Sequence, residues 1–237
     1  MNGVSDSLFR LLMLSDSACP VGSFSFSNGL ETAADEGLVY DAATLGGYAR
    51  DVARQSAFTD GVAALCARRS ALAEDYEAIA AADEQAFLCK LGGEARRMTC
   101  RMGRKASELA EKVLWDDPQV RWQPLGGRWT EDIRSGSVRG TWPAAQGLIF
   151  AIAGLSAREL FFSLCYGAAG TVLNAALRCV KVSHYDTQRI LSRMGADVGG
   201  WFAEAEDMTL GDMNAFAPQC DILASLHEQG TRRMFMN

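Results

Sequence analysis

The sequence is poor in residues and motifs that hold metals or nucleotides. It has only two histidines, His184 and His227, in 237 residues. No GxxxxGKS/T phosphate-binding loop, GxGxxG dinucleotide fingerprint or HExxH zinc motif occurs. His227 is followed by Glu228 but not by a second histidine four residues on. Cys220 lies seven residues before His227, a weak metal signal, and we interpret His227 as a structural histidine. The sequence therefore predicts no cofactor and no catalytic metal.

The cysteines lack the pattern of a disulfide framework or a metal site. There are seven, an odd number, no CxxC pair occurs, and most of them fall within apolar helical patterns. We interpret them as reduced, buried side chains of a cytosolic protein. The N-terminus also lacks a basic region followed by an apolar run and a cleavage site, so no secretory signal is predicted.

Charge and hydropathy bound the possible partners further. The net charge of −6 argues against a general nucleic-acid binder, because neutralising phosphates requires a positive field. The stretch nearest to a membrane span covers residues 160–177, but it contains Gly167, Gly170 and Asn174. We expect this stretch to be a helix buried inside a soluble all-α protein, with small residues that let neighbouring helices approach closely.

Helical periodicity covers most of the chain, and no sustained alternation of β-branched residues appears outside short stretches. Asp41 and Ser156 each provide an N-cap, and Gly37 and Gly154 each end a helix. We expect a single all-α domain over residues 1–237 with about eight to ten helices and no internal repeat. The predicted helices cover about 9–14, 30–36, 42–56, 59–73, 76–81, 84–114, 142–153, 157–177, 186–205 and 220–228.

Two regions are expected to be irregular. Residues 115–141 contain Trp115, Trp122 and Trp129 among prolines and glycines, which is typical of a loop. Residues 229–237 are expected to form a C-terminal tail.

The segment over residues 20–31, PVGSFSFSNGLE, is unusually rich in side-chain oxygens. Its serines alternate with Phe24 and Phe26, which predicts an extended segment with both rings turned inward. Asn28 and Glu31 have the spacing of a capping box and predict the start of a short helix. A nucleophilic serine is not supported, because no GxSxG elbow is present. We interpret the segment as an ordered turn.

The predicted helix over 84–114 carries a basic stripe beside its apolar face. Arg97, Arg101, Arg104 and Lys105 recur at helical spacing. This stripe is either a solvated helix face or a docking edge for an acidic protein partner.

Four motifs, in order, resemble the urease accessory protein F (UreF) family. Residues 20–31, preceded by the leucine-rich residues 11–14, are similar to the family's N-terminal signature, with Phe26 where a tyrosine is usual. Residues 96–104 resemble its central RxxSxxMGR helix, with Thr99 for serine. The remaining two matches are residues 164–167, similar to the YLYS segment, and Ala217, Pro218, Ser225, His227, Glu228, Arg233 and Phe235, similar to the closing motif.

One stretch departs from the family pattern. Where the family commonly has RLxPLGQxxxQ, this chain keeps Arg178 and Gln188 but has Lys181, Ser183 and His184 at the proline, glycine and first glutamine. The fold expectation is unaffected by these changes. They bear on partner specificity.

The resemblance implies an accessory protein that acts as a chaperone for nickel insertion and is not an enzyme. It implies a cytoplasmic protein, typically a homodimer, that works on the urease metallocentre. The implied partners are a UreD/UreH-type accessory protein, the GTPase UreG and apo-urease, with neither nucleic acid nor membrane involved.

The resemblance also nominates site residues. The N-terminal block and the tail are the candidate surface for the UreD/UreH-type partner, and Tyr166 is either a dimer contact or a core aromatic. The partner-binding candidates are Phe24, Ser25, Phe26, Glu31, Arg101, Arg104, His227, Glu228, Arg233 and Phe235.

Two alternative functions remain open from the sequence. One is a regulator that supplies an arginine such as Arg233 directly to the nucleotide site of the GTPase. The other is a direct nickel-binding carrier that uses His227, His184 and Cys220.

Overall fold

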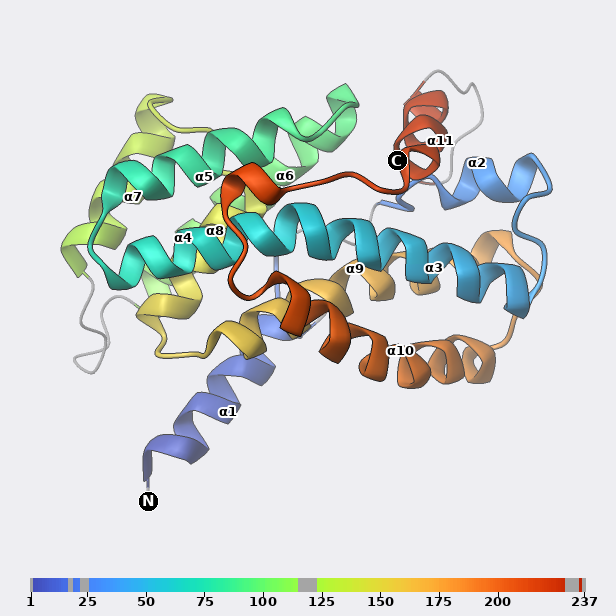
Figure 1. Ribbon diagram of the computed structural model, residues 1–237, viewed down its shortest axis with the longest axis horizontal. Coiled ribbons are helices and arrows are strands. Elements are labelled where there is room, and N and C mark those ends of the chain that lie inside the picture. The colour runs from blue at the N-terminus through green and yellow to red at the C-terminus, as the bar shows by residue number, and fades with distance from the viewer. Residues whose placement is uncertain (1, 17–18, 22–25, 115–122, 229–234, 236–237) are drawn as a thin grey trace.

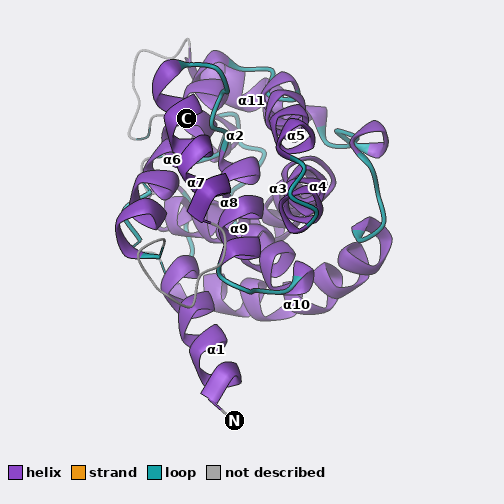
Figure 2. Cartoon of the chain, turned by 90° about the vertical axis from the view of Figure 1, so that its left-hand side faces the viewer, coloured by secondary structure: helices purple, strands orange, loops and turns teal. Residues whose placement is uncertain are grey.

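The computed structural model describes residues 2–16, 19–21, 26–114, 123–228 and 235 (Figure 1). Within these ranges the chain forms helices and connecting loops with no β-strand, which confirms the all-α prediction (Figure 2). The α-helices are α1 (Asn2–Ser15), α2 (Leu30–Asp35), α3 (Ala42–Ser56), α4 (Val62–Leu72), α5 (Tyr76–Leu88), α6 (Gly93–Val113), α7 (Gln123–Ser135), α8 (Trp142–Ile152), α9 (Ala157–Cys179), α10 (His184–Ala205) and α11 (Pro218–Glu228).

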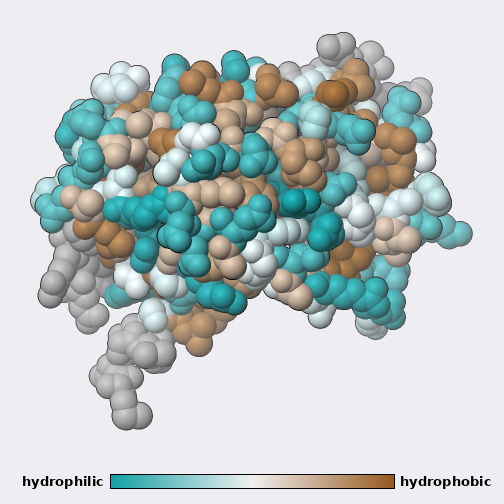
Figure 3. All heavy atoms as spheres, viewed as in Figure 1, coloured by the Kyte–Doolittle hydropathy of each residue, from teal (hydrophilic) through white to brown (hydrophobic). Residues whose placement is uncertain are grey.

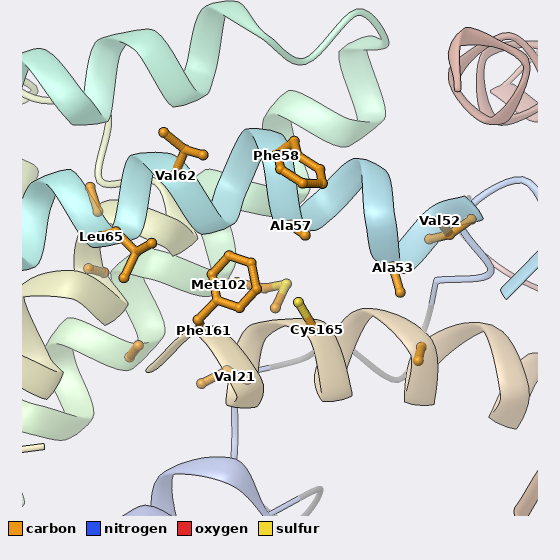
Figure 4. Packing of buried hydrophobic residues seen from close by; sticks show 14 of the residues in the cluster. Val21, Val52, Ala53, Ala57, Phe58, Val62, Leu65, Met102, Phe161 and Cys165 are labelled. Atoms are coloured by element: carbon orange, nitrogen blue, oxygen red, sulfur yellow. The ribbon is translucent and has the colours of Figure 1, made fainter. Parts of the chain in front are cut away.

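The centre of the fold is a long helical rod formed by α3, the π-helix η2 (Ala57–Gly61) and α4. One end of the rod, α4, packs on α8 and α5, while the other end, α3, packs on α9 and α10 (Figures 1 and 2). Ala53 and Ala57 of the rod point toward α9, and Phe161 and Cys165 of α9 point back toward the rod in the core (Figure 4). Burial of these apolar groups is the main stabilising contribution to the fold.

The π-helix corrects one predicted boundary. A new helix was expected to start at Thr59 or Asp60, but the rod continues through both residues. The Thr59 hydroxyl donates to the carbonyl of Gln55 at 2.8 Å, and the Phe58 carbonyl accepts from the backbone N–H of Asn214 at 3.2 Å. Carbonyls of the rod therefore receive donors from outside the regular α-helical ladder, which is compatible with a wider turn at this point.

Helix caps follow the sequence closely. Asp41 caps α3 through a capping box with Thr44, and Ser156 caps α9 through a capping box with Glu159, as predicted. A third capping box, formed by Ser183 and Asp186, starts α10 two residues before the predicted start. The glycines Gly37 and Gly154 have positive φ, consistent with their predicted role as helix ends.

The predicted capping box of Asn28 and Glu31 is wrong. Gly29 is the N-cap of α2, with φ of 78°, and no described side chain caps the helix. A Cβ at Gly29 would lie 2.8 Å from the backbone nitrogen of Ala224 in α11, so only glycine allows this approach. The Glu31 side chain is instead directed toward the C-terminal part of the chain.

The predicted helix over 84–114 is interrupted. Its first residues join the predicted helix over 76–81 to form α5, and α6 begins only at Gly93. In the turn between them, residues 89–92, the Arg96 guanidinium donates to the carbonyl of Lys90 at 2.7 Å. The turn places α6 against α8, where Gly103 is essential: a Cβ there would lie 2.2 Å from the carbonyl oxygen of Gly140.

The irregular stretch expected over 115–141 contains a helix, α7, from Gln123 to Ser135. Its Trp129 is fully buried, and the indole N–H donates to the Ser107 hydroxyl of α6 at 2.9 Å. Burial of a large aromatic side chain stabilises this helix despite the proline and glycines at its start.

A buried carboxylate joins α5 to the segment before α8. Asp83 is 1% exposed and accepts the backbone N–H groups of Arg139, Gly140 and Thr141 at 2.6–3.0 Å. The Thr141 hydroxyl donates to the same carboxylate at 2.6 Å. These bonds satisfy donors at the start of α8 that no helical carbonyl can reach.

Among the described residues, α9 is the one helix long and apolar enough to cross a membrane by length and composition. Half of its most apolar window is buried inside the fold, where α9 packs against α3 and α10. Hydrophilic residues are spread over the face of the molecule drawn in Figure 3. The burial of α9 fits the expected core helix.

Candidate partner-binding surface

Glu31 of α2 joins three segments that are distant in sequence. Its Oε2 atom lies 2.8 Å from Nε2 of His227, at the end of α11. The same oxygen accepts the backbone N–H of Phe235 at 3.1 Å. All three residues are buried, with exposures of 5%, 4% and 7%. Figure 1 shows α2 and α11 side by side.

Glu31 Oε2 makes both contacts. It accepts the backbone N–H of Phe235, and an ionised carboxylate, which can only accept, would take the Nε2 proton of His227 as well. The Nδ1 atom of His227 is buried and has no hydrogen-bond partner among the described residues.

The N-terminal segment and α11 are in close contact beyond this cluster. The Tyr48 hydroxyl of α3 donates to the backbone carbonyl of Asn28 at 2.7 Å and holds the residues just before α2. Gly29 brings the backbone of this turn against α11. Burial is the main cause that raises the pKa of the Tyr48 hydroxyl, so the group stays a hydrogen-bond donor.

The start of α11 is held by a second polar anchor. The Gln55 amide of α3 accepts from the backbone N–H of Ala217 at 2.8 Å and donates to Asp221 Oδ2 at 2.6 Å. Burial raises the pKa of the Asp221 carboxyl. The helix is therefore fixed near both ends by side chains from other elements.

The outer face of α11 is apolar. Ile222 and Leu226, four residues apart, are 54% and 49% exposed. Their spacing places them on one side of the helix. Neither residue is among the site residues predicted from the sequence, although their helical spacing next to the closing motif is a usable signal.

The basic stripe lies on α6, as predicted. Arg97, Arg101, Arg104 and Lys105 are all exposed. The Arg101 guanidinium lies 5.4 Å from the ring centroid of the buried Phe26, so the stripe borders the N-terminal segment. Lys105 forms an exposed ion pair with Glu108 at 2.8 Å within the same helix.

The structure brings some nominated residues together and says nothing of others. Glu31, His227 and Phe235 form one cluster, and Phe26 lies beside the basic stripe. Phe24, Ser25 and Arg233 lie outside the described residues, and Glu228 is described only as the last residue of α11.

Tyr166 lies on α9 with 54% of its surface exposed, so its interpretation as a core aromatic is wrong. It lines the same cavity as Leu12 of α1. Helix α1 extends away from the rest of the fold, with its Ser15 hydroxyl 2.8 Å from that of Ser163 (Figure 2). Leu8, Phe9 and Leu12 of α1 are exposed.

A cavity of about 1220 Å³ lies beneath α11, lined also by α1, α3, α6 and α9. Its polar part contains the Lys90–Asp60 ion pair, with Nζ and Oδ1 2.7 Å apart, and Asp221. In the described part of the chain, no group of three or more histidine, cysteine, aspartate or glutamate side chains is arranged to hold a metal ion. The nickel-carrier alternative therefore gains no support from these residues.

Comparison with known proteins gives a consistent answer. The UreF family model matches residues 39–195. A urease accessory protein UreF 2 from Brucella canis is 43% identical over 230 residues, which are 97% of this chain and 92% of the relative. A urease accessory protein UreF from Yersinia pseudotuberculosis is 36% identical over 230 residues, covering 97% of this chain and 98% of the relative. The four motifs, the all-α fold and these matches together establish that the chain belongs to the UreF family.

Proposed function

We propose that this chain is a non-catalytic scaffold for nickel insertion into urease. As a cytoplasmic homodimer, it links a UreD/UreH-type accessory protein and the GTPase UreG and brings them to apo-urease. A protein without a phosphate-binding loop can still couple the nucleotide state of a GTPase to metal delivery, because it shifts the partner's conformations by binding one of them more tightly.

The observation that carries the proposal is the joint surface made by the N-terminal segment and α11. Two of the family motifs, at opposite ends of the sequence, meet at Glu31 and His227. The exposed pair Ile222 and Leu226 provides an apolar centre for this surface. Apolar side chains at the centre of an interface contribute more to affinity than charges at its rim.

Two further surfaces complete the proposed assembly. Tyr166 is exposed on α9 and is the proposed contact between two copies of the chain. The basic stripe on α6 is the proposed contact for an acidic partner, because exposed guanidinium groups form paired hydrogen bonds with carboxylates.

The test is co-expression of the chain with a UreD/UreH-type protein and UreG, followed by size-exclusion chromatography with light scattering. A stable complex with two copies of this chain is expected. Replacing both Ile222 and Leu226 with serine should remove the UreD/UreH-type protein from the complex. Replacing Leu38, in the loop after α2, and Leu72, at the end of α4, with serine is the matched control, because both leucines are exposed. A folded wild-type chain that binds neither partner would contradict the proposal.

Turnover of GTP by purified UreG separates the scaffold from a direct regulator. A scaffold alone leaves the rate of the isolated GTPase unchanged until the other partners are present. A large increase caused by this chain alone, and lost in Arg233→Ala, would favour the regulator.

A further inference from the structure

The C-terminal helix is held in place by few contacts. It has eleven residues, too short to be stable as an isolated helix. On its inner side Cys220, Asp221 and Ala224 line the large cavity, while the backbone at Cys220 and Ala224 packs against the turn at Gly29. The orientation of the helix therefore depends on this close approach and on specific anchors at its ends.

Glu31 is the anchor at the C-terminal end. One of its carboxylate oxygens is hydrogen-bonded to the His227 imidazole and to the Phe235 backbone N–H. These two residues lie 196 and 204 positions from Glu31 in the sequence. Both donors are buried, and a buried donor that loses its acceptor is strongly penalised. The two bonds therefore fix the end of α11 and Phe235 relative to α2.

The anchored residues are not themselves a contact surface. Glu31, His227 and Phe235 are covered by protein, and the Phe235 ring is also covered by the Arg178 guanidinium, 5.6 Å from its centroid. Ile222 and Leu226 of the same helix face outward. A partner would bind the outward face, while the buried cluster sets its direction.

We propose that Glu31 is a positioning residue for partner binding. Its carboxylate holds α11 and Phe235 against α2, so that Ile222 and Leu226 meet the UreD/UreH-type partner in one fixed geometry. This inference rests on the proposed function for the partner, but the anchoring itself is a property of the isolated chain. A binding surface that is already ordered loses less conformational entropy on association.

The test compares two substitutions of Glu31 in the full-length chain. Glu31→Leu removes the acceptor, whereas Glu31→Gln keeps one oxygen that can accept both hydrogen bonds. Glu36, exposed just after α2, provides the matched controls Glu36→Leu and Glu36→Gln. The readouts are amide hydrogen exchange, the imidazole ¹⁵N spectrum of His227, and affinity for the UreD/UreH-type protein.

In Glu31→Leu, amide exchange at residues 223–228 and at Phe235 should accelerate about tenfold or more, because each lost hydrogen bond leaves a buried donor without an acceptor. Exchange in α4 and α8 should not change. The His227 spectrum should lose the signature of a hydrogen-bonded Nε2–H, and affinity for the partner should fall at least about tenfold. Glu31→Gln should restore most of the affinity, and both Glu36 variants should match the wild-type protein.

Several outcomes would overturn the inference. Unchanged exchange in α11 and at Phe235 would show that Glu31 does not anchor them. Faster exchange throughout α4 and α8 would make Glu31 a residue of general stability. Faster exchange in α11 with unchanged affinity for the UreD/UreH-type protein would show that Glu31 does not position the binding face. If the wild-type chain does not bind the partner, the proposed function and the positioning role fail together, while the exchange data still decide whether Glu31 is an anchor.

Discussion

Two buried carboxylates join distant parts of this chain, and they do so in different surroundings. Asp83 accepts three successive backbone N–H groups and a hydroxyl at the start of α8, where α4, α5 and α6 also pack. Glu31 is hydrogen-bonded to the His227 imidazole and to one backbone N–H where the short helices α2 and α11 meet. Both are almost completely covered, at 1% and 5% exposure.

The two carboxylates form the same kind of hydrogen bond but stabilise different parts of the molecule. Around Asp83, α8 is buried along nearly its whole length, so a lost hydrogen bond disturbs the main core. Around Glu31, α11 lies over a cavity and exposes apolar side chains, so a lost bond mainly changes how a surface is held. Local stability in proteins varies in this way between core helices and elements that bind partners.

The largest effect is expected at Asp83. Asp83→Ala leaves three backbone donors buried without an acceptor and should lower the free energy of unfolding by about 4 kcal/mol. Urea denaturation measures this change. The neighbouring Glu84, whose carboxylate pairs with Arg139 at the surface, is the control, and Glu84→Ala should cost about 0.5 kcal/mol or less. Similar losses in the two variants would contradict the role given to Asp83.

The close approach beside Asp83 gives the next largest effect. A Cβ at Gly103 would lie 2.2 Å from the Gly140 carbonyl oxygen and 2.5 Å from that of Thr141. Gly103→Ala should therefore lower the free energy of unfolding by about 3 kcal/mol, because backbone must move. A Cβ at Gly127 of α7 would meet no described atom within 4 Å, and Gly127→Ala should stabilise the protein by up to about 1 kcal/mol. Thermal unfolding of both variants checks the difference in sign.

Charge reversal on α6 tests how far the binding surface extends beyond the Glu31 region. Arg101→Glu with Lys105→Glu should weaken assembly with an acidic partner about tenfold at low salt and less at high salt. Arg101 also stacks on Phe26, so Arg104→Glu, which leaves that contact in place, separates charge from packing. Lys112→Glu, at the other end of the exposed face, is the control. Unchanged assembly by a folded double variant would leave the stripe as a solvated helix face.

Cysteine labelling gives the smallest but sharpest contrast. Burial raises the pKa of the Cys165 thiol in the core and of the Cys220 thiol at the start of α11 to about 12 each. At pH 8 both thiols should be almost entirely protonated and react slowly with a thiolate-selective reagent. In Glu31→Leu, Cys220 should react faster while Cys165 does not, as measured by mass spectrometry of labelled peptides. Equal rates at both sites would mean that α11 and the core open together.

Local signals in the sequence predicted much of the fold. Asp41 and Ser156 mark helix starts because their side chains and the third residue of each helix bond reciprocally to nearby backbone groups. Those interactions span three residues and are visible in any sequence. The family motifs likewise led to Glu31 and His227 before their contact was known.

The features of the fold and of the site that the sequence did not predict depend on contacts between residues that are distant in sequence. Glu31 has the spacing of a capping residue, but its actual partners are 196 and 204 residues away. A glutamate and a histidine are ordinarily expected at the surface, and their mutual hydrogen bond, together with the Phe235 N–H bond to the same carboxylate, makes their burial favourable. Helix α7 was missed for a similar reason, since its stability comes from Trp129 packing on α6 and not from helix propensity.

The π-helix in the central rod constrains the length of this part of the chain. An α-helix advances by about 100° per residue, so one extra residue changes which side chains face a neighbouring helix. The wider turn at Ala57–Gly61 absorbs such an offset, which lets α3 face α9 while α4 faces α8. Removing a single residue there would rotate one half of the rod relative to the other. In this stretch the number of residues is therefore constrained as well as their identity, since a Cβ at Gly61 would lie 2.8 Å from the Phe161 ring, and alignments of related chains should place gaps elsewhere.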